Sequence, residues 1–89
     1  MKLNIDSARL RAFLSAGGDC EALGENEFVA DLYDFDTPAT LDIVFGPKGE
    51  IECEAAQLLY DEEQAGWYMG ERIEDAKTIT AMLCAAMEG

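Results

Sequence analysis

Acidic side chains stand at every second position of residues 50–55, and one more, Asp42, lies in the neighbouring segment 40–45. Alternate residues of a β-strand point to the same face of its sheet, so this spacing predicts a row of carboxylates on one face. Such a row attracts the Lys and Arg side chains of a basic protein. An ordinary solvated face of an antiparallel sheet is the alternative. The predicted row consists of Asp42, Glu50, Glu52 and Glu54, with Asp31 as a further candidate.

Two groups of residues that follow are candidates for the same surface. Asp61, Glu62 and Glu63 form an acidic run, and we expect them to enlarge the row. The stretch Trp67-Tyr68-Met69 stands between Gly66 and Gly70. Trp and Tyr often anchor protein interfaces, although a linker between two helices more often packs inward. Inward packing is therefore favoured for Trp67, and an exposed anchor is the alternative.

The residues needed for catalysis are mostly missing. The chain has no histidine, which removes the ordinary Ser–His and Cys–His pairs. Neither GxxxxGK[ST] nor GxGxxG occurs. Nineteen carboxylates make any single acidic pair uninformative. We expect no enzymatic activity, no catalytic residue and no cofactor.

Metal sites are not indicated either. Cys20, Cys53 and Cys84 form no CxxC pair, which argues against zinc. Residues 31–36 resemble part of a calcium loop, but the glycine and the final glutamate of an EF-hand are missing. An odd number of cysteines, no apolar leader and no long apolar stretch predict a cytoplasmic protein that does not enter a membrane.

Net charge is the most unusual property of the composition. Nineteen Asp and Glu against six Lys and Arg give a net charge of −13. This exceeds the magnitude of roughly 2–8 that serves the solubility of a small domain. Such a surface repels nucleic acid and attracts cationic proteins. We therefore expect a basic protein partner and no direct binding of nucleic acid.

The first half of the chain predicts a helix followed by strands. Asp6 or Ser7 can cap a helix that ends at Gly17-Gly18. Residues 19–26 are expected to form a loop, and residues 28–35 a strand with Phe28 facing inward.

A hairpin is predicted from residues 40 to 55. The loop Gly46-Pro47-Lys48-Gly49 suits a three-residue turn with a left-handed glycine at its end. That turn pairs Phe45 with Ile51, so that the apolar residues share one face. It also places Asp42 opposite Glu54, which costs stability because like charges oppose each other.

Residues 56–65 read as a short helix closed by Gly66, and a strand continued through Tyr60 is the competing interpretation. Residues 71–87 predict a longer helix. The expectation is a single α+β domain over residues 1–89. It consists of a three-stranded antiparallel sheet with helices packed on one face, in the order α-β-β-β-α-α.

In size, charge and element order the chain resembles small acidic inhibitors encoded by phages and mobile elements, the anti-CRISPR and anti-restriction proteins. The resemblance covers the whole chain and rests on no motif. It implies an inhibitor that mimics DNA and occupies the nucleic-acid site of a basic effector in the host cytoplasm. No residue role is carried over from the family.

Two other classes fit the same composition. An immunity or antitoxin-type protein neutralises a basic toxin and usually adds aromatic anchors, here Trp67. A structural module forms a homodimer or larger homo-oligomer, for example through an edge strand.

Overall fold

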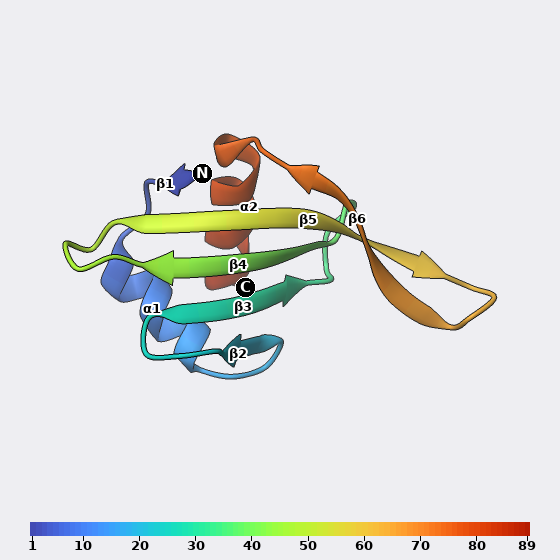
Figure 1. Ribbon diagram of the computed structural model, residues 1–89, viewed down its shortest axis with the longest axis horizontal. Coiled ribbons are helices and arrows are strands. Elements are labelled where there is room, and N and C mark those ends of the chain that lie inside the picture. The colour runs from blue at the N-terminus through green and yellow to red at the C-terminus, as the bar shows by residue number, and fades with distance from the viewer.

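The computed structural model describes residues 1–89 as one antiparallel sheet of six strands with two helices (Figure 1). The elements in chain order are β1 (Lys2–Leu3), α1 (Ser7–Ser15), β2 (Cys20–Ala22), β3 (Glu27–Leu32), β4 (Ala39–Phe45), β5 (Ile51–Asp61), β6 (Gly66–Ile73) and α2 (Ala76–Glu88).

The sheet is ordered β2-β3-β4-β5, and the far edge of β5 is shared by two strands. β1 pairs with the beginning of β5, where Leu3 lies opposite Ile51. β6 pairs with the rest of β5, from Ala55 opposite Ile73 to Asp61 opposite Gly66. All neighbouring strands are antiparallel.

The predicted three-stranded sheet with the order α-β-β-β-α-α is wrong. The sheet has six strands, and the predicted helix over residues 56–65 does not exist. β5 runs through to Asp61, as the competing interpretation held, because β6 pairs with it as far as Asp61 and the other edge is bonded as far as Leu58. The Leu58 amide donates to the carbonyl of Pro38 at 2.8 Å, while β6 pairs along the other edge.

The remaining differences are also strands that the sequence pattern did not indicate. Residues 66–73 form β6, so α2 begins at Ala76 and not at Glu71. The side chain of Asp75 caps α2 by accepting from the Lys77 amide at 3.1 Å. Part of the predicted loop 19–26 is β2, which adds an edge to the sheet by pairing with β3.

The hairpin of β4 and β5 is confirmed in its register. Phe45 lies opposite Ile51, and Asp42 lies opposite Glu54. The turn closes through Gly46, whose amide donates to the Glu50 carbonyl at 2.8 Å. Gly49 has φ +82°, the left-handed conformation that glycine adopts without a Cβ clash.

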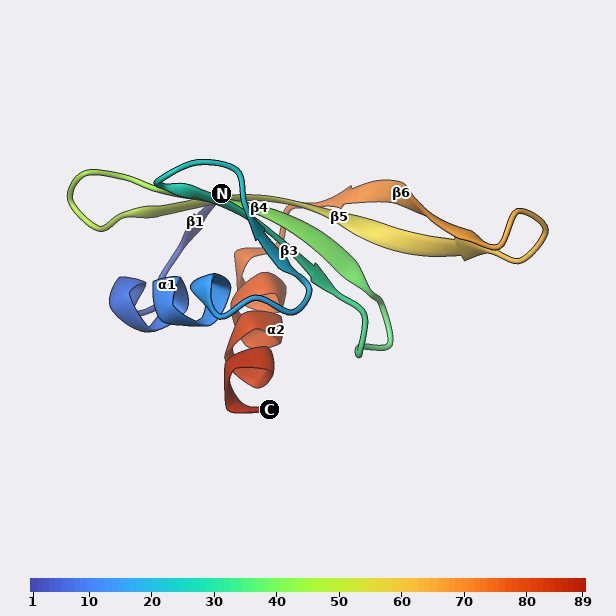
Figure 2. The same cartoon turned by 90° about the horizontal axis from the view of Figure 1, so that it is seen from below.

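Both helices lie on the same face of the sheet (Figure 2). Leu10 and Leu14 of α1 and Ile79 and Leu83 of α2 are almost fully buried against it. The confirmed helix α1 begins with a cap, since the Arg9 amide donates to the Asp6 carboxylate at 2.9 Å. The sheet contributes alternate residues to this core, namely Phe28, Ala30, Leu32, Ala39, Leu41, Ile43, Phe45, Ile51, Cys53 and Ala55. The opposite face, which we call the outer face, carries no helix.

β5 and β6 continue beyond the body of the sheet. β4 pairs with β5 only as far as Gln57, so from Leu58 onward β5 is joined to β6 alone. We call this two-stranded hairpin, residues 58–69, the ribbon. It projects to one side of the helices and contributes to extents of 44 × 25 × 23 Å (Figures 1 and 2).

Candidate functional site

The outer face carries acidic side chains in three rungs that cross the sheet. The middle rung runs from Glu54 through Asp42 and Val29 to Glu21. A second rung contains Glu52, Val44 and Glu27, and the third contains Ala56, Thr40 and Asp31. Directly opposed residues point to the same side, so these carboxylates share one face. The outer acidic face therefore consists of Glu21, Glu27, Asp31, Asp42, Glu52 and Glu54.

Three predicted residues, Asp42, Glu52 and Glu54, lie on this face, and so does the further candidate Asp31. Glu21 and Glu27 were missed because residues 19–26 read as a loop and the strand was expected to start at Phe28. A period of two through residues 27, 29 and 31 is the signal that finds Glu27.

Little within the chain neutralises these carboxylates. The ion pair found is between the Met1 amino group and Glu52, at 3.6 Å. Lys2 and Arg72 lie at the ends of two rungs, opposite Glu52 and Ala56, on the edge strands β1 and β6. The interior of the outer acidic face therefore contains no basic side chain.

Asp42 is the most constrained member of the face. It lies opposite Glu54, and its Oδ1 atom is buried without a hydrogen-bond partner. Its carboxyl hydrogen-bonds to Glu27 and repels the charge there, which raises the pKa of Glu27. Three carboxyl groups therefore crowd together, and no donor in the chain meets the buried oxygen.

Next to this cluster the outer face is hollowed. A depression of about 380 Å³ is lined by Val29, Asp42, Glu54 and, from β6, Met69 and Arg72. Arg72 brings one cation of the chain to this depression, where two carboxylates and apolar walls suit the stem and head of a further long basic side chain.

The structure does not bring the other predicted acidic residues to this cluster. Glu50 folds back over the hairpin turn, where its Oε1 accepts from the Lys48 amide at 3.2 Å. Asp61 shapes the tip of the ribbon by accepting from the Glu63 amide at 2.9 Å. Nine residues of β5 separate Glu52 from Asp61, a length of about 30 Å at the rise of a strand. Glu62 and Glu63 are exposed at that distant tip.

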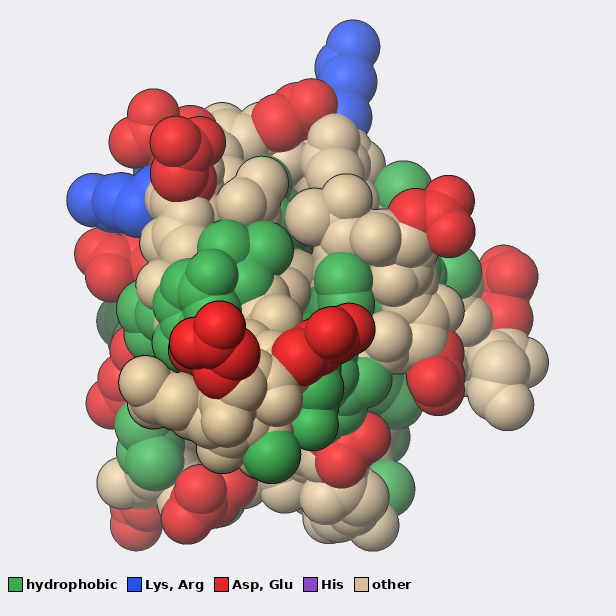
Figure 3. Space-filling view, turned by 90° about the vertical axis from the view of Figure 1, so that its right-hand side faces the viewer, with side chains coloured by type: hydrophobic (Ala, Val, Ile, Leu, Met, Phe, Trp, Pro, Cys, Tyr) green, Lys and Arg blue, Asp and Glu red, His purple; other side chains and the backbone are tan.

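Trp67 does not pack inward, which corrects the favoured interpretation. It is 46% exposed on the ribbon, and its ring centroid lies 5.1 Å from that of Tyr33 and 5.2 Å from that of Tyr60. We call these three residues the aromatic cluster. Figure 3 views the ribbon end of the molecule, where hydrophobic side chains lie beside acidic ones and basic side chains stand only at the margin.

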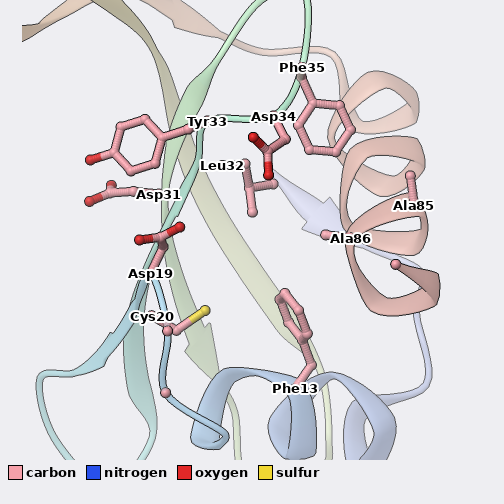
Figure 4. Close-up of a pocket in the computed structure, with 13 residues that line it drawn as sticks. Phe13, Asp19, Cys20, Asp31, Leu32, Tyr33, Asp34, Phe35, Ala85 and Ala86 are labelled. Atoms are coloured by element: carbon pink, nitrogen blue, oxygen red, sulfur yellow. The ribbon is translucent and has the colours of Figure 1, made fainter.

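A groove of about 470 Å³ lies on the helix side, between the end of α1, the end of β3 and α2 (Figure 4). Phe13 and Phe35 supply apolar walls and Asp34 a carboxylate, while the carboxylates of Asp19 and Asp31 turn away toward Tyr33 (Figure 4). Burial, with the charges of Asp19 and Asp31, raises the pKa of the Cys20 thiol, which makes it a weak nucleophile. The side chains form no cluster suited to a metal ion.

Comparison with known proteins gives no relative: no protein-family model, no curated protein and no solved structure matches the chain. No helix has the length and apolar character needed to cross a membrane.

Proposed function

We propose that this chain is an acidic binding protein that inhibits a basic, nucleic-acid-binding protein by occupying its nucleic-acid site. The outer acidic face is the contact surface. One observation carries the proposal: six carboxylates lie on one helix-free face, and only Glu52 has an ion-pair partner within the chain.

The spacing of the carboxylates supports mimicry of a phosphate backbone. Neighbouring strands lie about 4.8 Å apart, and residues on one face recur every ~6.6–6.8 Å along a strand. Duplex DNA carries one phosphate per ~3.4 Å of axis on each strand. Charges staggered over three neighbouring strands approach that density, so a groove lined with Arg and Lys would accept this face.

Unsatisfied groups on the face support a partner that donates hydrogen bonds. The buried Oδ1 of Asp42 lacks a hydrogen-bond partner, and the Asp42 carboxyl raises the pKa of Glu27, so both charges are unfavourable in isolation. A guanidinium group offers several N–H donors and a positive charge, which would satisfy both. The setting we propose is the cytoplasm, that of the host if a phage or mobile element encodes the chain.

The test compares two variants of equal charge. Glu52→Lys with Glu54→Lys alters the outer face, and Glu74→Lys with Glu88→Lys alters exposed positions that flank α2. Each substitution adds two charges, so both variants change from −13 to −9. Basic proteins are captured from cell extract on the immobilised chain at low salt, identified, and challenged with a duplex oligonucleotide.

We expect the outer-face variant to lose the captured protein and the α2 variant to keep most of it. Added salt and the duplex should both release the protein from the unmodified chain, since the contact is electrostatic. Equal capture by the two variants, or a captured protein that holds the duplex and the chain together, would contradict the proposal.

An immunity or antitoxin role is the second candidate, and the exposed aromatic cluster favours it. In that case Trp67→Ala would weaken binding more than Glu52→Lys. Homodimerisation through the outer edge of β6 stays a prediction, which size measurement at two concentrations tests.

A further inference from the structure

Three aromatic rings are exposed on the outer side of the molecule, with the ring of Trp67 in contact with both tyrosines. Tyr33 follows β3, Tyr60 lies near the end of β5, and Trp67 lies in β6 between them. Their exposed fractions are 36%, 50% and 46%. Soluble proteins seldom leave contiguous apolar surface open unless it binds something.

Carboxylates lie on both sides of the aromatic cluster. On one side lies Asp31. Burial, together with the charges of Asp31 and Asp19, raises the pKa of the Tyr33 hydroxyl. On the other side Asp61 lines a depression at the ribbon tip with Trp67 and Tyr68, and its Oδ1 atom accepts from the Glu63 and Gln64 amides. The rings of the cluster therefore lie in a negative potential.

No cation of the chain occupies these rings. The cation–π contacts of the structure are made by Arg11, which lies 4.4 Å from the ring centroid of Phe45 and 5.9 Å from that of Phe28. Both of those rings belong to the core. The aromatic cluster is thus a set of free π faces beside carboxylates.

We propose that the aromatic cluster binds an arginine side chain of the basic partner. The guanidinium group stacks on the face of Trp67, Tyr33 or Tyr60, while Asp31 accepts from its N–H groups. Arginine suits this place better than lysine because its planar cation stacks and is weakly hydrated. Nucleobases also stack on aromatic platforms, but a chain of charge −13 repels their phosphates.

This inference rests on the proposed function, because it names how the same partner is held at a second point. Tyr60 lies six positions after Glu54 in β5, which is about 20 Å along a strand. The partner would therefore present two cationic groups about that far apart, one for the outer acidic face and one for the aromatic cluster.

The test uses the one tryptophan of the chain as its reporter. Three nine-residue peptides, identical except that they carry three arginines, three lysines or three citrullines, are titrated while Trp67 emission is recorded. We expect the arginine peptide to change the emission at a concentration several-fold lower than the lysine peptide does. The uncharged citrulline peptide should give no change.

Ring removal supplies the variants. Tyr33→Leu and Tyr60→Leu should each weaken the arginine response about two- to fivefold, the scale of an exposed cation–π contact. Tyr33→Phe keeps the ring and should keep the response. Tyr68→Leu is the matched control, because Tyr68 is equally exposed on the other face of the ribbon, where it pairs with Leu59. A thermal melt of each variant checks that the fold is retained.

The inference is overturned if lysine acts as well as arginine, or if Tyr68→Leu weakens the response as much as Tyr33→Leu. The inference fails while the proposed function stands if two results are found together. Glu52→Lys with Glu54→Lys abolishes capture of the partner, whereas Tyr33→Leu and Tyr60→Leu change neither the capture nor the arginine response. An arginine response that depends on the rings supports it, even if no captured protein is displaced from nucleic acid. That last result would overturn the proposed function instead.

Discussion

Replacing Asp42 by Asn should make the protein more stable. Asp42 lies opposite Glu54 and hydrogen-bonds to Glu27, and its Oδ1 atom is buried without a partner. Asn has nearly the same shape and no charge. Its amide N–H groups can donate hydrogen bonds to the neighbouring carboxylates. Asp42→Asn therefore removes a repulsion and supplies a missing hydrogen bond with little disturbance of packing.

The size of the effect follows from two contributions at this position. Like charges directly opposed in a sheet cost roughly 0.2–1 kcal/mol. An unsatisfied buried polar group costs roughly 1–3 kcal/mol, of which the amide recovers only a part. We expect a gain in the free energy of unfolding of about 1–2 kcal/mol. For a domain of this size each kcal/mol moves Tm by about 4–8 °C.

The pH dependence of this gain has a defined sign. Asp42 raises the pKa of Glu27 above its usual value of 4.5. A raised carboxyl pKa means that the ionised group destabilises the folded state, so stability increases as pH falls through the folded pKa of Glu27 toward 4.5. Asp42→Asn removes the main cause of that shift. The advantage of the variant should be largest at pH 7 and should shrink on acidification.

Thermal melts of both proteins between pH 4.5 and pH 7.5 measure this prediction. Asp36→Asn, an exposed loop position, removes one charge elsewhere and controls for the general relief of negative charge. The reasoning is refuted if Asp42→Asn melts no higher than Asp36→Asn at pH 7, or if its advantage grows toward pH 4.5. If the stable variant also binds the partner less well, the cluster is retained for function at a cost in stability.

Three further perturbations test other parts of the structure. Asp75→Ala removes the cap of α2 and should lower Tm. Hydrogen bonds from Thr78 and the Lys77 amide lower the pKa of Asp75, so the difference in Tm between the two proteins should disappear as pH falls below 3.8. Burial raises the pKa of Cys53 to about 11, so a thiol reagent at pH 8 should leave Cys53 unmodified until the protein is unfolded; mass spectrometry showing rapid native labelling would contradict this. Gly49→Ala places a side chain at φ +82° and should cost about 1–2 kcal/mol in urea unfolding, and an unchanged midpoint would argue against the turn geometry.

Sequence reasoning succeeded where turn chemistry and alternation agreed. The loop from Gly46 to Gly49 and the apolar residues on both sides of it permit one register, and the structure has that register. The same argument placed Asp42 and Glu54 on one face, which is the centre of the outer acidic face.

It failed where pairing between distant segments overrides local preference. Residues 56–65 are mostly good helix formers, yet β6 and the Pro38 carbonyl hold residues 56–61 in β5. Residues 66–73 give a weak strand signal, because a register shift opposite Ala56–Leu58 interrupts their alternation. The contact between Trp67 and Tyr33 joins residues far apart in the chain, so no local sequence pattern predicts it.

Because β5 has two neighbours as far as Gln57 and only β6 beyond it, one continuous strand belongs to two regions of unequal strength. An isolated two-stranded hairpin is marginal in water. The amide protons of the ribbon should exchange with solvent through local opening, while those between β4 and β5 should exchange only on global unfolding. A ligand bound at the aromatic cluster should therefore slow amide exchange in the ribbon alone. Its measured affinity would be reduced by the free energy needed to order the ribbon.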